Sequence, residues 1–245
     1  MCTVTFIARK QGYLLGMNRD EQRSRPAGLP PSERKLDGHR VIYPSEPGGG
    51  TWISLNDSGV TLALINLYSV ARKVATNPVS RGEIIPSMST ADSSEFVEIG
   101  LTKLLLPRIN PFRLIGVFQK PQGVVEWRWD LRELTRRDHS WTSQQWISSG
   151  FDEPTAQTIR SRTFKRFLTQ TSAGASGWLR RLHSSHTPER GPFSTCMHRD
   201  DATTVSYTEI SVSRDQAAIH HICGTPCESS GMSRDSIINN HEDRR

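Results

Sequence analysis

Short apolar runs separated by turn residues dominate the chain and predict pairs of antiparallel strands. Residues 3–7 and 13–17 are rich in β-branched and aromatic side chains, and they flank a polar connection that ends in Gly12. Two such runs joined by a short glycine-containing segment predict a β-hairpin. The same pattern predicts further hairpins at 51–55 with 60–67, 114–119 with 124–129, and 203–212 with 217–222.

Helical periodicity is confined to the middle of the chain. Apolar residues recur at helical spacing over 96–105, with a cap expected at 90–92 and a stop near Pro107. A second helix is expected from Glu153 to Leu168, and Trp178 to Leu182 indicate a third. Strands at both ends with helices between them favour an α+β sandwich. We expect one domain over 1–230 and a polar, flexible tail over 231–245.

Composition is that of a globular chain. Of the 245 residues, 35% are hydrophobic and 23% are charged, which is enough apolar material for a core. No run approaches the roughly 18 apolar residues of a membrane span, and the start lacks a secretory leader, so we expect a cytoplasmic protein. The net charge is +6, but arginine is scattered and not gathered in a stripe, which argues against nucleic-acid binding.

Cys2 is the first candidate for chemistry. If Met1 is removed, Cys2 carries a thiol and a free α-amino group, whose pKa is normally about 7.7–8.0. A base with a pKa near neutrality would then lie beside the nucleophile that it must deprotonate. The alternative is that Cys2 is only a small buried residue at the start of a strand.

The tetrapeptide Asn18-Arg19-Asp20-Glu21 favours the chemical interpretation. The first hairpin brings Arg19 and Asp20 back beside Cys2. A guanidinium is expected to lower the pKa of the thiol, and a carboxylate can accept a hydrogen bond from the terminal ammonium. The alternative is a charged turn that follows a strand.

Three motifs together resemble a known family. The segments MCTVTFIA, GMNRDEQRSRPAGLP and GGGTWISLNDSGVTLALINL resemble the NRDE family, also called the transport and Golgi organisation family. The later Ser80-Arg81-Gly82-Glu83 and the 194–212 segment resemble further parts of it. That family is similar to the choloylglycine hydrolase and penicillin acylase group of N-terminal-nucleophile (Ntn) enzymes.

The resemblance implies a four-layer αββα sandwich of antiparallel sheets. It implies Cys2 as the nucleophile, Arg19 and Asp20 as the residues around it, and Asn66 as an oxyanion-hole donor. We expect Asn18, Glu21 and Trp52 to contribute to binding, although Trp52 and Asn66 are also plausible as core residues.

The chain departs from the acylase group at one position of the expected oxyanion hole. The acylase group has a second asparagine on a downstream strand, whereas this chain has Ser148 and Ser149 there. Losing one oxyanion donor costs roughly 10²–10³ in kcat.

We interpret Arg81 and Glu83 as an ion pair at a helix start.

A second group of reactive residues lies near the end of the chain. His220, His221, Cys223 and Cys227 fall within eight residues, and Cys196 with His198 could add ligands. Structural zinc sites usually combine two closely spaced pairs, and adjacent strand residues point to opposite faces. We therefore expect no metal site, and four cysteines without secretory context predict no disulfide.

Two functions remain open from the sequence. The first is hydrolysis or acyl transfer at a non-peptide C–N bond of a small-molecule amide, without a cofactor. The second is a non-enzymatic carrier of haem or another hydrophobic metabolite, in which Cys2 is unused or ligates the iron. The sequence leaves the oligomeric state open.

Overall fold

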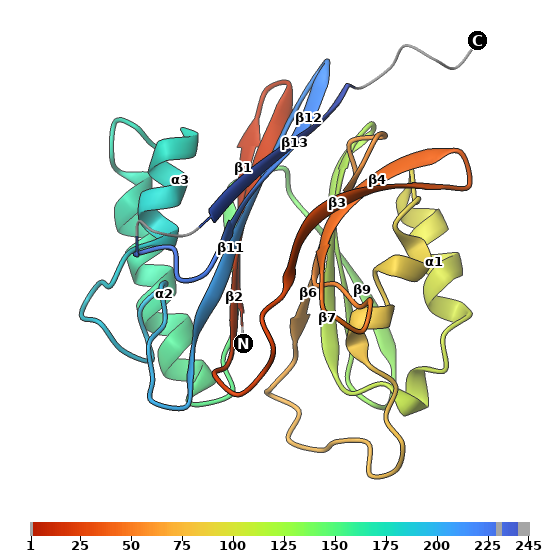
Figure 1. Ribbon diagram of the computed structural model, residues 1–245, viewed down its shortest axis with the longest axis horizontal. Coiled ribbons are helices and arrows are strands. Elements are labelled where there is room, and N and C mark those ends of the chain that lie inside the picture. Colours follow the sequence, from red (N-terminus) through yellow and green to blue (C-terminus); the bar gives the residue numbers. More distant parts are fainter. Residues whose placement is uncertain (1, 229–231, 240–245) are drawn as a thin grey trace.

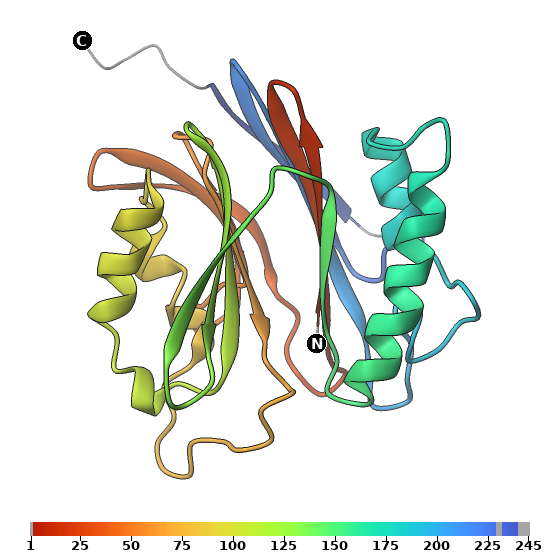
Figure 2. The ribbon, with the colours of Figure 1, turned by 180° about the vertical axis from the view of Figure 1, so that it is seen from behind.

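Two antiparallel sheets stack face to face in the computed structural model, which describes residues 2–228 and 232–239. Helices cover both outer faces, so the layers run helix, sheet, sheet, helix (Figures 1 and 2). The four-layer αββα sandwich expected from the resemblance is confirmed.

The first sheet has the order β10-β1-β2-β11-β12-β13. Its strands are β1 (Cys2–Arg9), β2 (Gly12–Gln22), β10 (Gln144–Ser148), β11 (Ala202–Ser213), β12 (Gln216–Cys223) and β13 (Met232–Asn239). The second sheet follows the chain from β3 to β9. Its strands are β3 (Leu29–Leu36), β4 (His39–Ser45), β5 (Ile53–Asn56), β6 (Thr61–Asn66), β7 (Phe112–Gln119), β8 (Gln122–Trp129) and β9 (Leu134–His139).

Helices α2 (Glu153–Leu168) and α3 (Ser176–His183) pack on the first sheet, and α1 (Ser94–Thr102) packs on the second (Figure 1). Short 3-10 turns η1 (Arg81–Glu83), η2 (Pro86–Met88) and η3 (Leu106–Arg108) flank α1. Helix α2 begins where the sequence predicted, with Asp152 as its cap. Helix α1 begins later than predicted, because the Ser93 side chain and not residues 90–92 accepts the Phe96 N–H.

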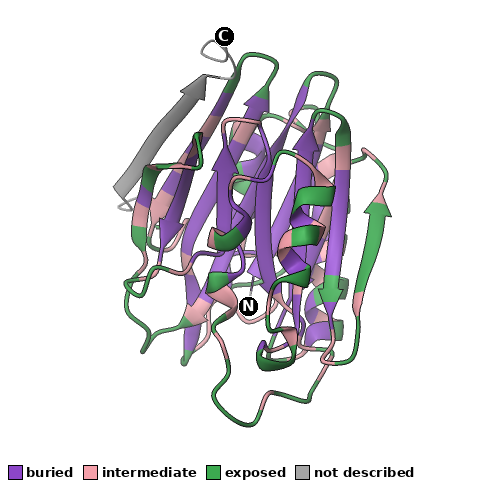
Figure 3. Cartoon of the chain, turned by 90° about the vertical axis from the view of Figure 1, so that its right-hand side faces the viewer, coloured by how far each residue is buried: buried purple, intermediate pink, exposed green. Residues whose placement is uncertain are grey.

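The central core determines which residues of β1 can reach a ligand between the sheets. Cys2, Val4 and Phe6 belong to the inter-sheet cluster, whereas Ile7 packs with α2 and α3. This is the alternation of a strand that is buried on both faces. Figure 3 shows that the inner strands of both sheets are buried along most of their length, whereas a strand at the sheet edge is exposed. The start of β1 therefore directs the Cys2 thiol toward the second sheet.

The four predicted hairpins are confirmed as β1–β2, β5–β6, β7–β8 and β11–β12. The strands β3 and β9 were not predicted, because most of their residues are polar and exposed, as is usual for strands at sheet edges. Met232–Asn239, which we expected to belong to a polar, flexible tail, pair with β12 as strand β13. The rest of that tail lies outside the described residues. Within the described part of the chain, no helix is long and apolar enough to cross a membrane.

Candidate active site around Cys2

Strand pairing places three candidate residues in one row across the first sheet. Cys2 lies opposite Arg19 of β2 and opposite Ser148 of β10. Side chains of directly opposite residues point to the same face, with Cβ atoms about 4.5–5.5 Å apart. The hairpin predicted from the sequence therefore brings Arg19 beside Cys2. Ser148 lies beside Cys2 for a different reason, because β10 pairs with the other edge of β1.

A cavity of about 350 Å³, lined by Cys2 and Arg19 but not by Ser148, opens between the two sheets. Small-molecule sites usually measure about 300–1,000 Å³, so the cavity has room for a small ligand. Of the residues predicted for the site, Asn18 is absent from its lining. Those that line it are Cys2, Arg19, Asp20, Glu21, Trp52 and Asn66.

Arg19 is held from three sides. Its Nη2 lies 2.6 Å from a carboxylate oxygen of Glu46 and 3.4 Å from one of Glu21, and its guanidinium lies 4.4 Å from the centre of the Trp52 ring. The side chain is almost fully buried. Two carboxylates thus neutralise much of the charge that Arg19 would otherwise direct at the thiol.

The Cys2 thiol is less acidic than the sequence predicted. Burial raises its pKa most, and the negative charge of Asp20 raises it further; the positive chain terminus, the Asp20 backbone N–H and the Arg19 guanidinium lower the pKa without outweighing burial. The prediction of a pKa below the free value is wrong, because the thiol is only 8% exposed and Arg19 is engaged by carboxylates. A thiol of this kind needs an adjacent base to accept its proton.

Asp20 belongs to a buried network that sequence reasoning missed. Its Oδ1 accepts a hydrogen bond from Thr204 Oγ1 at 2.6 Å, and its Oδ2 lies 3.4 Å from Nη1 of Arg160. Arg160 is fully buried on α2 and also donates to Thr3 Oγ1 at 2.7 Å. An arginine on an otherwise amphipathic helix carries no sequence signal that it will be buried. The network fixes Asp20 beside the start of β1.

Asn18, which the sequence analysis expected to contribute to binding, does not line the cavity. Its Nδ2 donates to the carbonyls of His183 and Thr195, each at 2.8 Å, and its Oδ1 lies 3.1 Å from Nδ1 of His183. Strand alternation explains the difference, because Asn18 and Arg19 are neighbours on β2 and point to opposite faces. Asn18 fastens the helical layer to the first sheet.

His183 should make the fold sensitive to mild acid. Burial lowers its pKa to about 3, against about 6.5 in an unfolded chain. The neutral imidazole is favoured in the fold, so its contribution is complete above pH 6.5 and is lost as the pH falls toward 3. Between pH 7 and pH 4 this amounts to on the order of 3 kcal/mol of unfolding free energy. Urea titrations at both pH values should show a smaller decrease for His183→Gln than for wild type, and equal decreases would contradict the assignment.

The GGGTW and RGE motifs meet at the cavity. A Cβ on Gly50 would lie 3.1 Å from the Cα of Gly82, and the Thr51 N–H donates to the Gly82 carbonyl at 2.9 Å. This close approach needs glycine on both sides and brings Arg81 to the cavity wall. The predicted ion pair of Arg81 with Glu83 is wrong: Arg81 donates to the Pro111 carbonyl at 3.0 Å, and none of the ion pairs found in the described chain includes it. Burial lowers the pKa of Arg81.

Asn66 lines the cavity, and its side-chain amide makes one hydrogen bond within the protein. Its Nδ2 donates to the Tyr68 hydroxyl at 2.7 Å. An amide nitrogen carries two hydrogens, so one remains for a ligand. Asn110, which the sequence analysis did not single out, also lines the cavity, and its Oδ1 accepts the Val74 N–H at 2.9 Å. This bond turns the oxygen away and leaves the Asn110 amide nitrogen as a second potential donor.

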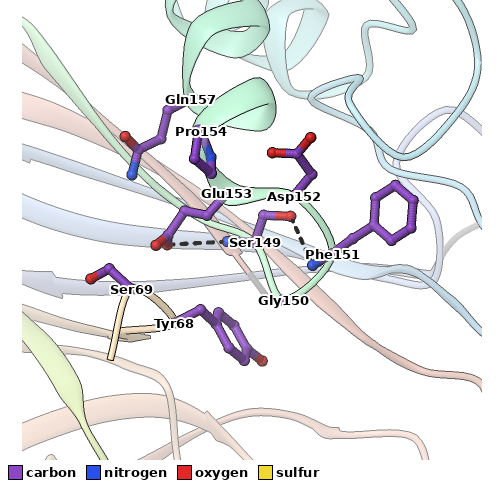
Figure 4. Close-up of a pocket in the computed structure, with 9 residues that line it drawn as sticks. All are labelled: Tyr68, Ser69, Ser149, Gly150, Phe151, Asp152, Glu153, Pro154 and Gln157. Atoms are coloured by element: carbon purple, nitrogen blue, oxygen red, sulfur yellow. Dashed lines mark hydrogen bonds between the residues drawn. The ribbon is translucent and has the colours of Figure 1, made fainter. Parts of the chain in front are cut away.

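The two serines predicted in place of a second asparagine are separated. Ser148 is fully buried, and its Oγ has no hydrogen-bond partner among the described residues. Ser149 lies instead in a second cavity of about 800 Å³, with Tyr68 and Glu153 (Figure 4). Its backbone N–H points at Glu153 Oε1, 3.4 Å away. The larger cavity holds no cysteine, so we place the site at the smaller one.

Comparison with known proteins identifies the family to which the chain belongs. The sequence model of the family described as Transport and Golgi organisation 2 matches residues 1–127. The chain belongs to this family. No protein with a curated description matches the chain. The matched segment contains the NRDE, GGGTW and RGE motifs, all of which contribute residues to the cavity, and it also contains Asn66.

Among solved structures, the chain resembles Ntn hydrolases in fold. Two variants of the conjugated bile acid hydrolase from Clostridium perfringens align with a TM-score of 0.58 at 9% identity, covering 100% of this chain and 98% of theirs. Penicillin V acylase from Agrobacterium tumefaciens aligns with a TM-score of 0.52 at 11% identity, covering 96% and 90%. At these identities the likeness shows the fold, and the sheet ends that carry Cys2 belong to the aligned region.

Proposed function

We propose that this member of the Transport and Golgi organisation 2 family is a cytoplasmic N-terminal-cysteine hydrolase or acyltransferase that acts on a non-peptide amide. The observation that carries the proposal is the Cys2 thiol at the start of β1, facing a cavity that also holds Arg19, Asn66 and Arg81. The four free cysteines support a reducing compartment.

The proposed chemistry begins when Met1 is removed. The α-amine of Cys2 accepts the thiol proton as sulfur attacks the amide carbonyl, and Asn66 donates to the oxyanion. The C–N bond breaks, the amine leaves with the proton, and a thioester remains on Cys2. Water, or another amine in the case of transfer, then attacks the thioester. The raised pKa of the thiol makes the adjacent amine necessary, because little thiolate forms without a base.

The cavity favours a substrate that carries a negative charge. Arg19 and Arg25 are already paired with Glu21 and Glu46. Arg81 is partly desolvated and is held by a neutral carbonyl. A desolvated guanidinium binds a carboxylate or phosphate strongly. We therefore expect an acyl amide with an anionic group near the scissile bond.

Arg81→Gln should change how Cys2 discriminates between charged and neutral reagents. Iodoacetate carries a charge that Arg81 attracts, whereas iodoacetamide is neutral and of similar size. Loss of the guanidinium should lower the iodoacetate to iodoacetamide rate ratio at Cys2 by roughly five-fold, as about 1 kcal/mol of charge interaction implies. Peptide mapping of Cys2 measures both rates. Arg72→Gln is the matched control, because Arg72 is exposed and does not line the cavity, and a ratio unchanged by Arg81→Gln would contradict the assignment.

Haem fits this cavity poorly. Six charged side chains line the cavity: Arg19, Asp20, Glu21, Arg25, Glu46 and Arg81. Ligand sites for large hydrophobic groups are lined mainly by apolar side chains. The volume of about 350 Å³ is also at the lower end of the range for ligand sites. These features favour the enzyme over a carrier of haem or a similar hydrophobic metabolite.

The proposal is tested by screening the processed protein against a panel of acyl amides with neutral and anionic acyl groups. Release of the free amine together with a transient acyl adduct on Cys2 is the expected result. A panel without amine release, combined with saturable spectral binding of haem, would overturn the proposal in favour of the carrier.

A further inference from the structure

Four potential metal ligands converge where the loop between α3 and β11 meets the end of β12, outside the Cys2 cavity. They are His186, in the loop after α3, Cys196 and His198, further along that loop, and Cys227, after β12. One ligand atom from each lies within 4.8 Å of the ligand atoms of all the others. Cys196 is buried and the other three are half-buried. Two sulfurs and two imidazole nitrogens form the ligand set of many structural zinc sites.

The three distances from His198 Nε2 to the other ligand atoms are close to those of a tetrahedron around zinc. With Zn–N near 2.05 Å and Zn–S near 2.3 Å, tetrahedral geometry requires N···N of about 3.4 Å and S···N of about 3.6 Å. Nε2 of His186 lies 3.1 Å from Nε2 of His198. The Sγ atoms of Cys196 and Cys227 lie 3.6 and 3.4 Å from the same His198 nitrogen.

Hydrogen bonding alone does not account for this arrangement. Nε2 of His198 is approached by one nitrogen and two sulfurs. A neutral ring nitrogen has either one hydrogen to donate or one lone pair to accept with, so in either tautomer it makes one well-directed hydrogen bond and not three. A cation among the four atoms would bind the lone pairs of all of them.

We propose that His186, Cys196, His198 and Cys227 bind a structural Zn²⁺ ion. The set supplies four ligands and leaves no open position for a substrate, which is the pattern of structural and not of catalytic zinc. The inference does not depend on the function proposed for Cys2.

The surroundings of His198 provide the outer hydrogen bond that zinc-bound histidines usually make. Its Nδ1 lies 3.4 Å from Thr203 Oγ1, and that hydroxyl donates to the Met197 carbonyl at 3.1 Å. An Nδ1–H donated to Thr203 leaves the Nε2 lone pair for the metal. Nη2 of Arg190 also lies 3.3 Å from Nδ1, and in this tautomer Arg190 would turn to Glu228, which is 3.6 Å away.

A zinc ion at these four residues would stabilise the helical layer that packs behind Cys2 on the first sheet. The loop that carries three of the ligands accepts a hydrogen bond from Arg160 Nη2 through the Pro192 carbonyl, at 3.2 Å. The same loop receives Asn18 Nδ2 at the Thr195 carbonyl. Arg160 and Thr204 in turn hold Asp20. Zinc would thus fasten the loop to the end of β12 and stabilise the partners of Asp20.

Three of these residues, Cys196, His198 and Cys227, were candidates from the sequence, but we expected no metal site and gave His186 no role. Cys227 was grouped with His220, His221 and Cys223, but His221 is buried and bonds to Thr208 at 2.9 Å. The actual neighbours of Cys227 lie some thirty or forty residues earlier in a loop without regular spacing. Only the fold brings them together.

Metal analysis of the tag-free protein tests the proposal. We expect a single Zn²⁺ per chain by mass spectrometry of the elements, and we expect Co²⁺ to give the strong visible absorption of a tetrahedral thiolate site. Cys196→Ser and Cys227→Ser should reduce bound zinc to background. Cys223→Ser, the same change four residues from Cys227 and outside the cluster, should retain it.

A second measurement covers variants that do not fold. In the wild-type protein, Zn²⁺ should protect Cys196 and Cys227 from alkylation until a chelator is added, and chelation should lower the melting temperature. Two results would overturn the proposal: wild-type protein that neither contains nor takes up Zn²⁺ or Co²⁺ stoichiometrically, or a disulfide between Cys196 and Cys227 in protein kept under reducing conditions.

Discussion

Cys2→Ser should abolish turnover of any amide that the protein hydrolyses. Removing the nucleophile of a hydrolase lowers kcat by on the order of 10⁶ where it has been measured, and the remaining rate comes from binding and the oxyanion donors. A serine hydroxyl at this position would face the same amine, but it is a far weaker nucleophile than a thiol near neutral pH. The measurement is amine release from the best substrate of the panel, with circular dichroism to confirm the fold.

The control for this experiment is Cys223→Ser, which makes the same chemical change outside the cavity and should retain full activity. Asn66→Ala should have an intermediate effect, a loss of about 10²–10³ in kcat, because it removes one oxyanion donor. Activity that survives Cys2→Ser would exclude Cys2 as the nucleophile.

Arg160→Met should destabilise the protein more than any other single change considered. Arg160 and Asp20 are both buried, and deleting one member of a buried ion pair leaves the other charge without its partner, at a cost of about 3–5 kcal/mol. The methionine also removes the bonds to Thr3 and Pro192. Chemical denaturation measures the change in unfolding free energy.

Arg162→Met provides the matched control. Arg162 lies on the same helix but is exposed, so its replacement should change stability by no more than about 0.5 kcal/mol. Equal stability of the two variants would show that the Arg160 and Asp20 contact contributes little. Arg160→Met should also slow acylation of Cys2, because Asp20 then loses a partner that positions it.

The parts of the site that could be predicted from sequence are those joined by local structure. Cys2 and Arg19 are brought together by one hairpin, and a hairpin follows from its strand pattern and its turn. Successive residues of a strand point to opposite faces, so Asn18 and its neighbour Arg19 could not both face the cavity. The expectation that Asn18 contributes to binding treated the four-residue motif as one unit and overlooked this alternation.

The parts that could not be predicted depend on contacts between distant segments. Arg160 reaches Asp20 across 140 positions of the sequence, and Arg81 enters the cavity because Gly50 and Gly82 touch. The acidity of Cys2 was misjudged for a related reason. Burial and the position of Glu46, which neutralises Arg19, are properties of the fold, whereas the presence of Arg19 is a property of the sequence. Strand β3 carries too few apolar residues to be recognised at a sheet edge.

One mass-spectrometric experiment tests the central claim most directly. The purified protein is mixed with an activated acyl donor, and its intact mass and peptide map are recorded before water completes the reaction. The account predicts a chain that begins at Cys2 and carries one acyl group on the Cys2 sulfur. A chain that retains Met1, or an acyl group found on Cys196, Cys223 or Cys227 instead, would contradict it.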